Sequence, residues 1–163
     1  MKKVLAFVGG VLLLVNTAFA YDAELAKKLD ATFSQLTPEA LQHLPVLIDS
    51  KKFFEMLKNK EPFVFLDIRT PEEMSITGIT WKNTLRIPMH ELFKEENLKK
   101  LPKDKKIIVI CHSGARAAAA TLALRAVGFK NAYFYKGGLP ELAKDTGIAD
   151  LGKNVGLNII REY

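Results

Sequence analysis

The only cysteine in this chain of 163 residues is Cys111, and the residues around it suit sulfur chemistry. An apolar run at residues 107–110 precedes Cys111, and the loop His112-Ser113-Gly114-Ala115-Arg116 follows it. Gly114 and the small neighbouring side chains leave backbone amides accessible, and a helix that starts after the loop adds its positive end. Together with the Arg116 guanidinium, such amides stabilise an anionic sulfur. We therefore expect Cys111 to be a nucleophile that takes up sulfur and passes it on.

Other polar residues near this loop are weaker candidates for chemistry. Asp67 and Arg69 end a second apolar run, where such a pair more often satisfies loop amides and nearby carboxylates than reacts, although both could touch substrate at the same sheet edge. His112 is expected to line the entrance, because a thiolate held by amides needs no general base. Arg116 is the better candidate for holding the sulfonate oxygens of an anionic donor. The three histidines are far apart in sequence, so we expect no metal site and no cofactor.

Alternating strands and helices must position these residues. Apolar runs predict strands at residues 46–48, 63–66, 84–87, 107–110 and 132–135. Helix signals start at Asp49 or Ser50 and at Thr70, with short helices within residues 89–101 and further helices at 117–127 and 140–144. This order predicts an α/β domain with a mainly parallel sheet, and ligands bind at the carboxyl ends of strands in such sheets. The segment after Thr146 carries no pattern that predicts an element.

The two ends of the chain lie outside this alternation. Residues 1–20 combine a basic start, an apolar stretch of twelve residues and an Ala-Phe-Ala ending, which predicts a cleaved export signal. An uncleaved membrane anchor is the alternative, although the apolar stretch is short for a span. Residues 21–45 are expected to form an N-terminal helical extension, and residues 46–163 the domain with a C-terminal tail. Cleavage would lower the formal net charge from +6 to +4, an excess too scattered to indicate nucleic acid.

The loop at residues 111–116 resembles the six-residue active loop of the rhodanese family. Residues 65–73 resemble the family's Asp-x-Arg strand end, residues 86–88 its Ile-Pro strand end, and the glycines at 128, 137 and 138 its closing segments. The likeness covers about residues 46–145 and, with the signal, extends to small periplasmic rhodaneses, including the phage-shock type. It implies a three-layer α/β/α fold with a five-stranded parallel sheet, catalysis by Cys111, a sulfur pocket of amides from residues 112–116, and thiosulfate as the usual assay donor.

Two segments depart from the family's usual pattern. Residues 75–82 lack the histidine that often stands there, and residues 139–142 lack a tryptophan that often follows the paired glycines. Both changes concern packing and the rim of the pocket, so they put the substrate preference in question more than the reaction.

The sequence therefore predicts an exported, periplasmic sulfurtransferase. It would move sulfane sulfur from a small anionic donor such as thiosulfate to a thiol or cyanide through a Cys111 persulfide, without nucleic acid and without stable membrane association after cleavage. A sulfur carrier or partner-binding module without turnover is one alternative. A cysteine phosphatase or arsenate reductase is another, but their cradle places five residues between Cys and Arg, whereas four separate Cys111 from Arg116.

Overall fold

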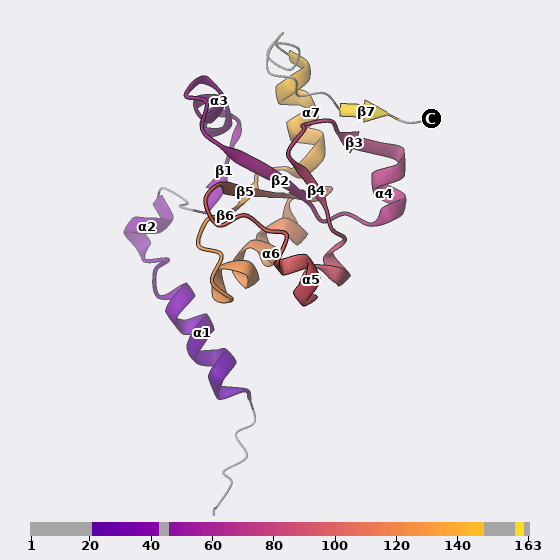
Figure 1. Ribbon diagram of the computed structural model, residues 1–163. Helices are drawn as coiled ribbons and strands as arrows, with labels where there is room; N and C mark the ends of the chain where they lie inside the picture. The colour runs from indigo at the N-terminus through magenta and orange to yellow at the C-terminus, as the bar shows by residue number, and fades with distance from the viewer. Residues whose placement is uncertain (1–20, 43–45, 149–158, 162–163) are drawn as a thin grey trace, which may run out of the picture.

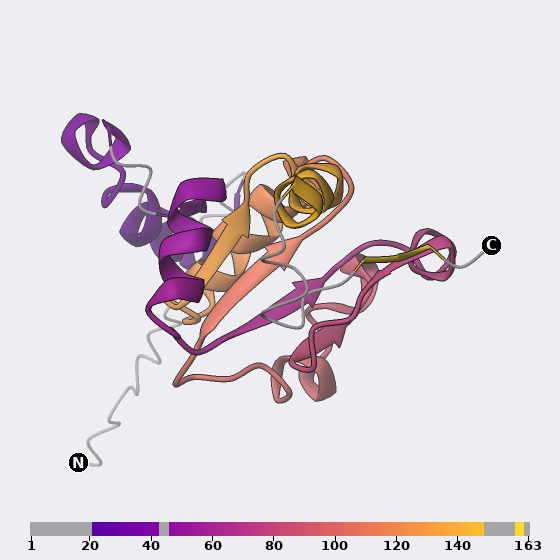
Figure 2. The same ribbon diagram turned by 90° about the horizontal axis from the view of Figure 1, so that it is seen from above.

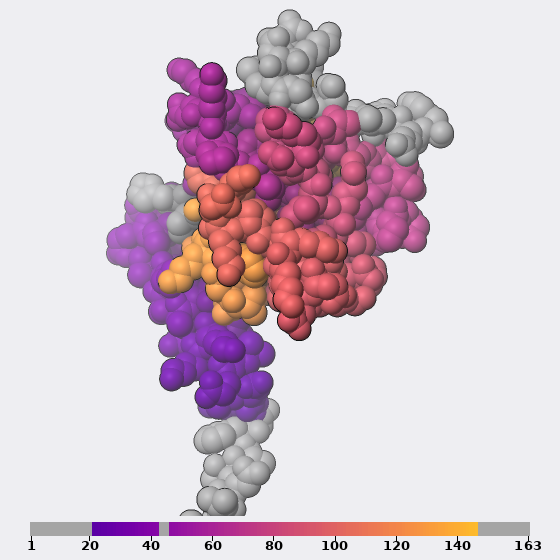
Figure 3. Space-filling view, in the orientation of Figure 1, coloured from indigo at the N-terminus to yellow at the C-terminus, as the bar shows by residue number. Residues whose placement is uncertain are grey.

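The computed structural model describes residues 21–42, 46–148 and 159–161 (Figure 1). The predicted signal at residues 1–20 lies outside these ranges. Two helices, α1 (Ala23–Phe33) and α2 (Pro38–Gln42), come first. In the space-filling view, α1 extends below the rest of the domain and α2 lies at its left side (Figure 3). The Asp22 carboxylate caps α1 by accepting a hydrogen bond from the Leu25 amide, and α1 contacts α6 although none of its own residues is buried.

Five parallel strands form the central sheet, as predicted. Its order is β1-β6-β5-β2-β4, so β5 lies in the middle between β6 and β2. The strands are β1 (Leu47–Ile48), β2 (Phe63–Asp67), β4 (Thr84–Arg86), β5 (Lys106–Ile110) and β6 (Ala132–Tyr135). Every residue of β2 and the last four of β5 are buried, which is why both strands read as continuous apolar runs.

Helices cover both faces of this sheet and complete three layers. Ile107 and Val109 of β5 belong to a core with α6 (Ala115–Ala126), beside the short η1 (Met89–Glu91) and α5 (Glu95–Leu98). On the opposite face, Ile108 and Ile110 belong to a core with α3 (Ser50–Lys58) and α7 (Gly138–Ile148). Figure 2 shows α3 and α7 lying over the sheet, seen from above. The α/β/α architecture is therefore confirmed.

The helix starts follow local capping chemistry. Asp49 caps α3, and Thr70 opens α4 (Pro71–Ile76) with a capping box whose other member is Glu73. Two helices begin earlier than predicted. Helix α6 starts at Ala115 and not at residue 117, because Gly114 turns the chain at φ +97° and serves as the N-cap. Helix α7 starts at Gly138 and not at residue 140.

A two-stranded antiparallel ribbon was not predicted. Strand β3 (Thr77–Ile79) follows α4 without a loop and pairs with β7 (Ile159–Arg161) near the end of the chain. A three-residue strand shows too little alternation to be read from sequence, and its partner lies in the tail that carried no pattern. Among the helices of the described ranges, none has both the length and the apolar character that crossing a membrane requires.

Candidate active site

Cys111 lies directly after β5, at the carboxyl edge of the sheet, and its side chain is fully buried. Its Sγ accepts hydrogen bonds from the Gly114 amide at 3.2 Å and from the Ala117 amide at 3.4 Å. Both amides belong to the start of α6, so the sulfur lies at the positive end of a twelve-residue helix. This geometry suits a sulfur that carries negative charge.

The loop amides divide into an inner and an outer set. Of the five residues predicted to ring the sulfur with their amides, only Gly114 donates its backbone amide to Sγ. The second contact comes from Ala117, which the sequence placed inside the helix. Ala117 is the third residue of α6, and the amides of a first helical turn have no acceptor within their own helix. That rule is the signal by which the sequence could have identified it.

The outer amides remain free to bind an anion. Within residues 21–42 and 46–148, no acceptor contacts the backbone amides of His112, Ser113, Ala115 or Arg116. The side chains of His112, Ser113 and Ala115 are exposed, so this part of the loop faces solvent. The role of His112 at an entrance to the site stays a prediction.

Gly138 packs directly against the backbone of the loop that starts at Cys111. A Cβ atom at this position would lie 2.3 Å from the His112 carbonyl oxygen and 2.6 Å from that of Cys111. The next residue, Leu139, donates its amide to the Cys111 carbonyl oxygen at 2.9 Å. The sequence predicted a turn at the paired glycines but not that their backbone packs against the active loop, which only a residue without a side chain permits.

Asp67 and Arg69 bind each other in a buried ion pair. The Arg69 guanidinium donates to both Asp67 carboxylate oxygens, with Nη2 at 2.6 Å from Oδ2, and the two residues are 0–1% exposed. Arg69 also donates to the carbonyl and hydroxyl oxygens of Thr77 and to the carbonyl oxygen of Glu73. Its donors therefore hold the α4–β3 segment, and the buried charges are compensated.

Arg116 has a partner that the sequence did not predict. Its Nη1 donates to Glu73 Oε2 at 2.8 Å and its Nη2 to Glu73 Oε1 at 2.6 Å, a two-pronged ion pair between α6 and α4. The hydrogen bonds from Arg116 lower the pKa of Glu73 to about 2. The pKa of Arg116 is raised, chiefly by its hydrogen bonds to Glu73 and to a smaller extent by interaction with Cys111.

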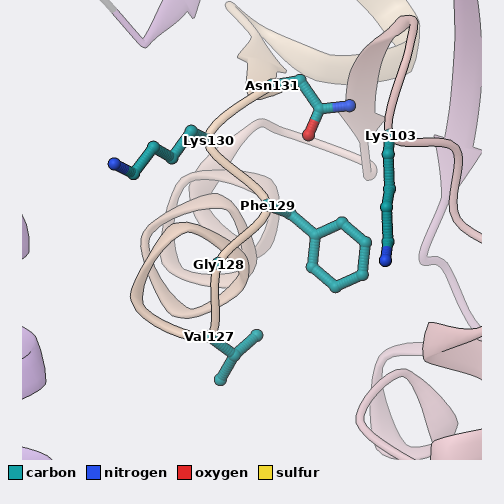
Figure 4. Close-up of a pocket in the computed structure, with 6 residues that line it drawn as sticks. All are labelled: Lys103, Val127, Gly128, Phe129, Lys130 and Asn131. Atoms are coloured by element: carbon teal, nitrogen blue, oxygen red, sulfur yellow. The ribbon is translucent and has the colours of Figure 1, made fainter.

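A hollow of about 540 Å³ lies between Lys103 and residues 127–131 (Figure 4). It lies at the far end of α6, about 18 Å from Cys111 along a helix of this length. In the described part of the chain, no three histidine, cysteine or acidic side chains gather as metal ligands would.

The rhodanese-like domain family matches residues 50–145, more than half of the chain. This chain belongs to that family. A protein named sulfurtransferase from Allochromatium vinosum is 32% identical over 92 residues, which cover 56% of this chain and 82% of that protein. The mitochondrial thiosulfate sulfurtransferase RDL2 of Saccharomyces cerevisiae is 33% identical over 86 residues, covering 52% of this chain and 58% of the yeast protein.

The family also contains proteins with other names and greater lengths. The tRNA uridine(34) hydroxylase of Pelagibacter ubique is 36% identical over 100 residues, but the match covers only 32% of that enzyme and 60% of this chain. Among solved structures, the BH2092 protein of Bacillus halodurans superposes with a TM-score of 0.53 at 22% identity, over 69% of this chain and 81% of that one. This likeness shows the fold. The family and the relatives named as sulfurtransferases support sulfur transfer as the general chemistry.

Proposed function

We propose that this chain is a sulfurtransferase that carries sulfane sulfur on Cys111 as a persulfide. The observation that carries the proposal is the division of the loop amides into two sets. Two amides contact the buried Sγ, and four more, in the exposed or half-exposed residues 112, 113, 115 and 116, have no acceptor within the described structure. A thiolate needs the first set, and an outer persulfide sulfur, which is also anionic, needs the second.

The reaction proceeds by two displacements on sulfur. The Cys111 thiolate attacks the outer sulfur of thiosulfate, the Sγ–S bond forms, and the S–S bond of the donor breaks with its electron pair leaving on sulfite. An acceptor thiolate or cyanide then attacks the outer sulfur of the persulfide. That bond breaks toward Sγ, which returns to the thiolate, so charge is conserved in each half-reaction.

Loop size favours sulfur over phosphate at this site. With four residues between Cys111 and Arg116, the amides converge on a single sulfur atom and leave little room for a tetrahedral phosphoryl group. The guanidinium that a phosphate would need is paired with Glu73. Phosphatase or arsenate reductase chemistry is therefore the weaker assignment.

Intact mass of the protein after thiosulfate, with cyanide added afterwards, tests the proposal. Wild type should gain one sulfur atom and lose it to cyanide as thiocyanate. Cys111→Ser should do neither, because no other thiol exists. Sulfur uptake without release to any acceptor would indicate a carrier without turnover. Transfer by the Ser variant, or phosphate release from an aryl phosphate at a comparable Cys111-dependent rate, would contradict the assignment.

We also propose that the protein works outside the cytoplasm, in the periplasm of a bacterium. The support is the order of residues 1–20, with a basic start, an apolar stretch and Ala18 and Ala20 at the cleavage positions. Small thiols and thiol proteins are present there as acceptors, and the lone Cys111 has no internal partner with which to form a disulfide.

A further inference from the structure

We propose that Glu73 sets the donor preference of the Cys111 site: by pairing with Arg116 it disfavours dianionic donors such as thiosulfate relative to persulfides whose carbon group is uncharged. This inference rests on the sulfur-transfer function proposed above and assigns a specificity-determining role to a residue in α4.

Several hydrogen bonds fix the position of the ion pair between Arg116 and Glu73. Both terminal nitrogens of Arg116 donate to the Glu73 carboxylate, at 2.6 and 2.8 Å. The carboxylate is held from its other side, because Glu73 Oε2 also accepts the Thr70 amide at 2.9 Å in the capping box of α4. Glu73 is therefore held in place, and Arg116 can turn away from it toward a donor only by giving up both hydrogen bonds.

The net charge of the Arg116–Glu73 pair also disfavours a dianionic donor. Arg116 and Glu73 neutralise each other, and the pKa of Glu73 near 2 keeps its carboxylate ionised at any pH at which the protein would work. Arg69 cannot replace Arg116, because it is buried and bonded to Asp67. A thiosulfate ion at the loop thus meets a neutral pair that includes a carboxylate. A persulfide with an uncharged carbon group carries at most one charge, on the sulfur that the amides bind.

The decisive variant is Glu73→Gln, which keeps the side-chain length and an oxygen for the Thr70 amide but removes the negative charge. The KM for thiosulfate should fall about fivefold to tenfold, the effect of removing one like charge near a dianion in a solvent-screened site. With hydroxyethyl persulfide, kcat/KM should stay within about twofold, because this donor lacks the second charge.

Two controls accompany this variant. Glu72→Gln changes the net charge equally at the neighbouring position, which is exposed and outside the pair, and its KM for thiosulfate should equal that of wild type. In the double variant Glu73→Gln, Arg116→Ala the gain should disappear, because the freed guanidinium produces it. Thermal unfolding of each variant verifies that it is folded.

The outcomes separate the inference from the proposed function. An unchanged thiosulfate KM in folded Glu73→Gln, or a gain equal to that of Glu72→Gln, overturns the inference. An equal loss with both donors also overturns it, since Glu73 would then only hold the loop in place. If wild type takes up sulfur from neither donor, the proposed function itself fails.

Discussion

Replacement of Gly138 by alanine tests whether the close contact between the paired glycines and the active loop holds the sulfur site together. The matched control is Gly128→Ala. Both glycines have positive φ, +67° at Gly138 and +112° at Gly128, so each alanine adopts a sparsely populated conformation that costs about 1–3 kcal/mol. A Cβ atom at Gly128 would meet nothing within 4 Å. The two variants therefore share the backbone penalty and differ in the contact.

The steric contact adds a further loss of unfolding free energy in Gly138→Ala. Its Cβ would lie 2.3 Å from the His112 carbonyl oxygen, so the two segments must separate by about 1 Å to reach ordinary contact. That shift breaks the hydrogen bond from Leu139 to Cys111, worth about 1 kcal/mol, and distorts packing at about 1–3 kcal/mol more. Gly138→Ala should thus lose about 2–4 kcal/mol more unfolding free energy than Gly128→Ala.

The same shift should slow sulfur uptake. It displaces the Cys111 and His112 carbonyl groups, and the same peptide groups carry the His112 and Ser113 amides. The rate at which Cys111 gains sulfur should fall about 100-fold in Gly138→Ala, the usual cost of misplacing amide donors around an anion. It should stay within about twofold of wild type in Gly128→Ala. Urea unfolding and time-resolved intact mass measure the two quantities. Equal stability and equal rates in the two variants would refute the reasoning.

Two further predictions concern the ion pair and the chain start. The pKa of Glu73 is depressed from 4.5 to about 2, so the stability it contributes is complete above pH 4.5 and is lost as pH falls toward 2. Between pH 4.5 and 2, the unfolding free energy should therefore fall less steeply for Glu73→Gln than for wild type. An equal fall in the two proteins would show that the ion pair contributes no stability. N-terminal sequencing of exported protein should begin at Tyr21, whereas membrane-bound protein that retains Met1 would indicate an anchor.

Local patterns predicted the framework of this domain well. Strands β2 and β5 were readable because strands buried on both faces are continuous apolar runs, and the α4 start was readable because its capping box lies within four residues. The alternation of strands and helices then implied a parallel sheet with Cys111 at its carboxyl edge. Each of these features depends on neighbours in sequence.

The features that sequence did not reveal depend on distant partners. Glu73 and Arg116 are 43 positions apart, and an acidic residue in a capping box gives no sign that an arginine on another helix will bind it. The packing of Gly138 against the Cys111 loop and the pairing of β3 with β7 are likewise set by the folded topology. Asp67 and Arg69 were identified as polar residues at a strand end, but the ion pair between them was not predicted.

The complete burial of Sγ has a consequence for the regiochemistry of the proposed persulfide. A nucleophile that cleaves the S–S bond must approach along its axis, from the side opposite the leaving sulfur. With the outer sulfur directed toward the exposed residues of the loop, the path for attack on Sγ would run through the buried side of the site. That reaction would release hydrogen sulfide and leave the acceptor bound to Cys111 as a mixed disulfide. Attack on the outer sulfur would come from the solvent side. Burial of Sγ therefore favours transfer of the outer sulfur to the acceptor over formation of a mixed disulfide at Cys111.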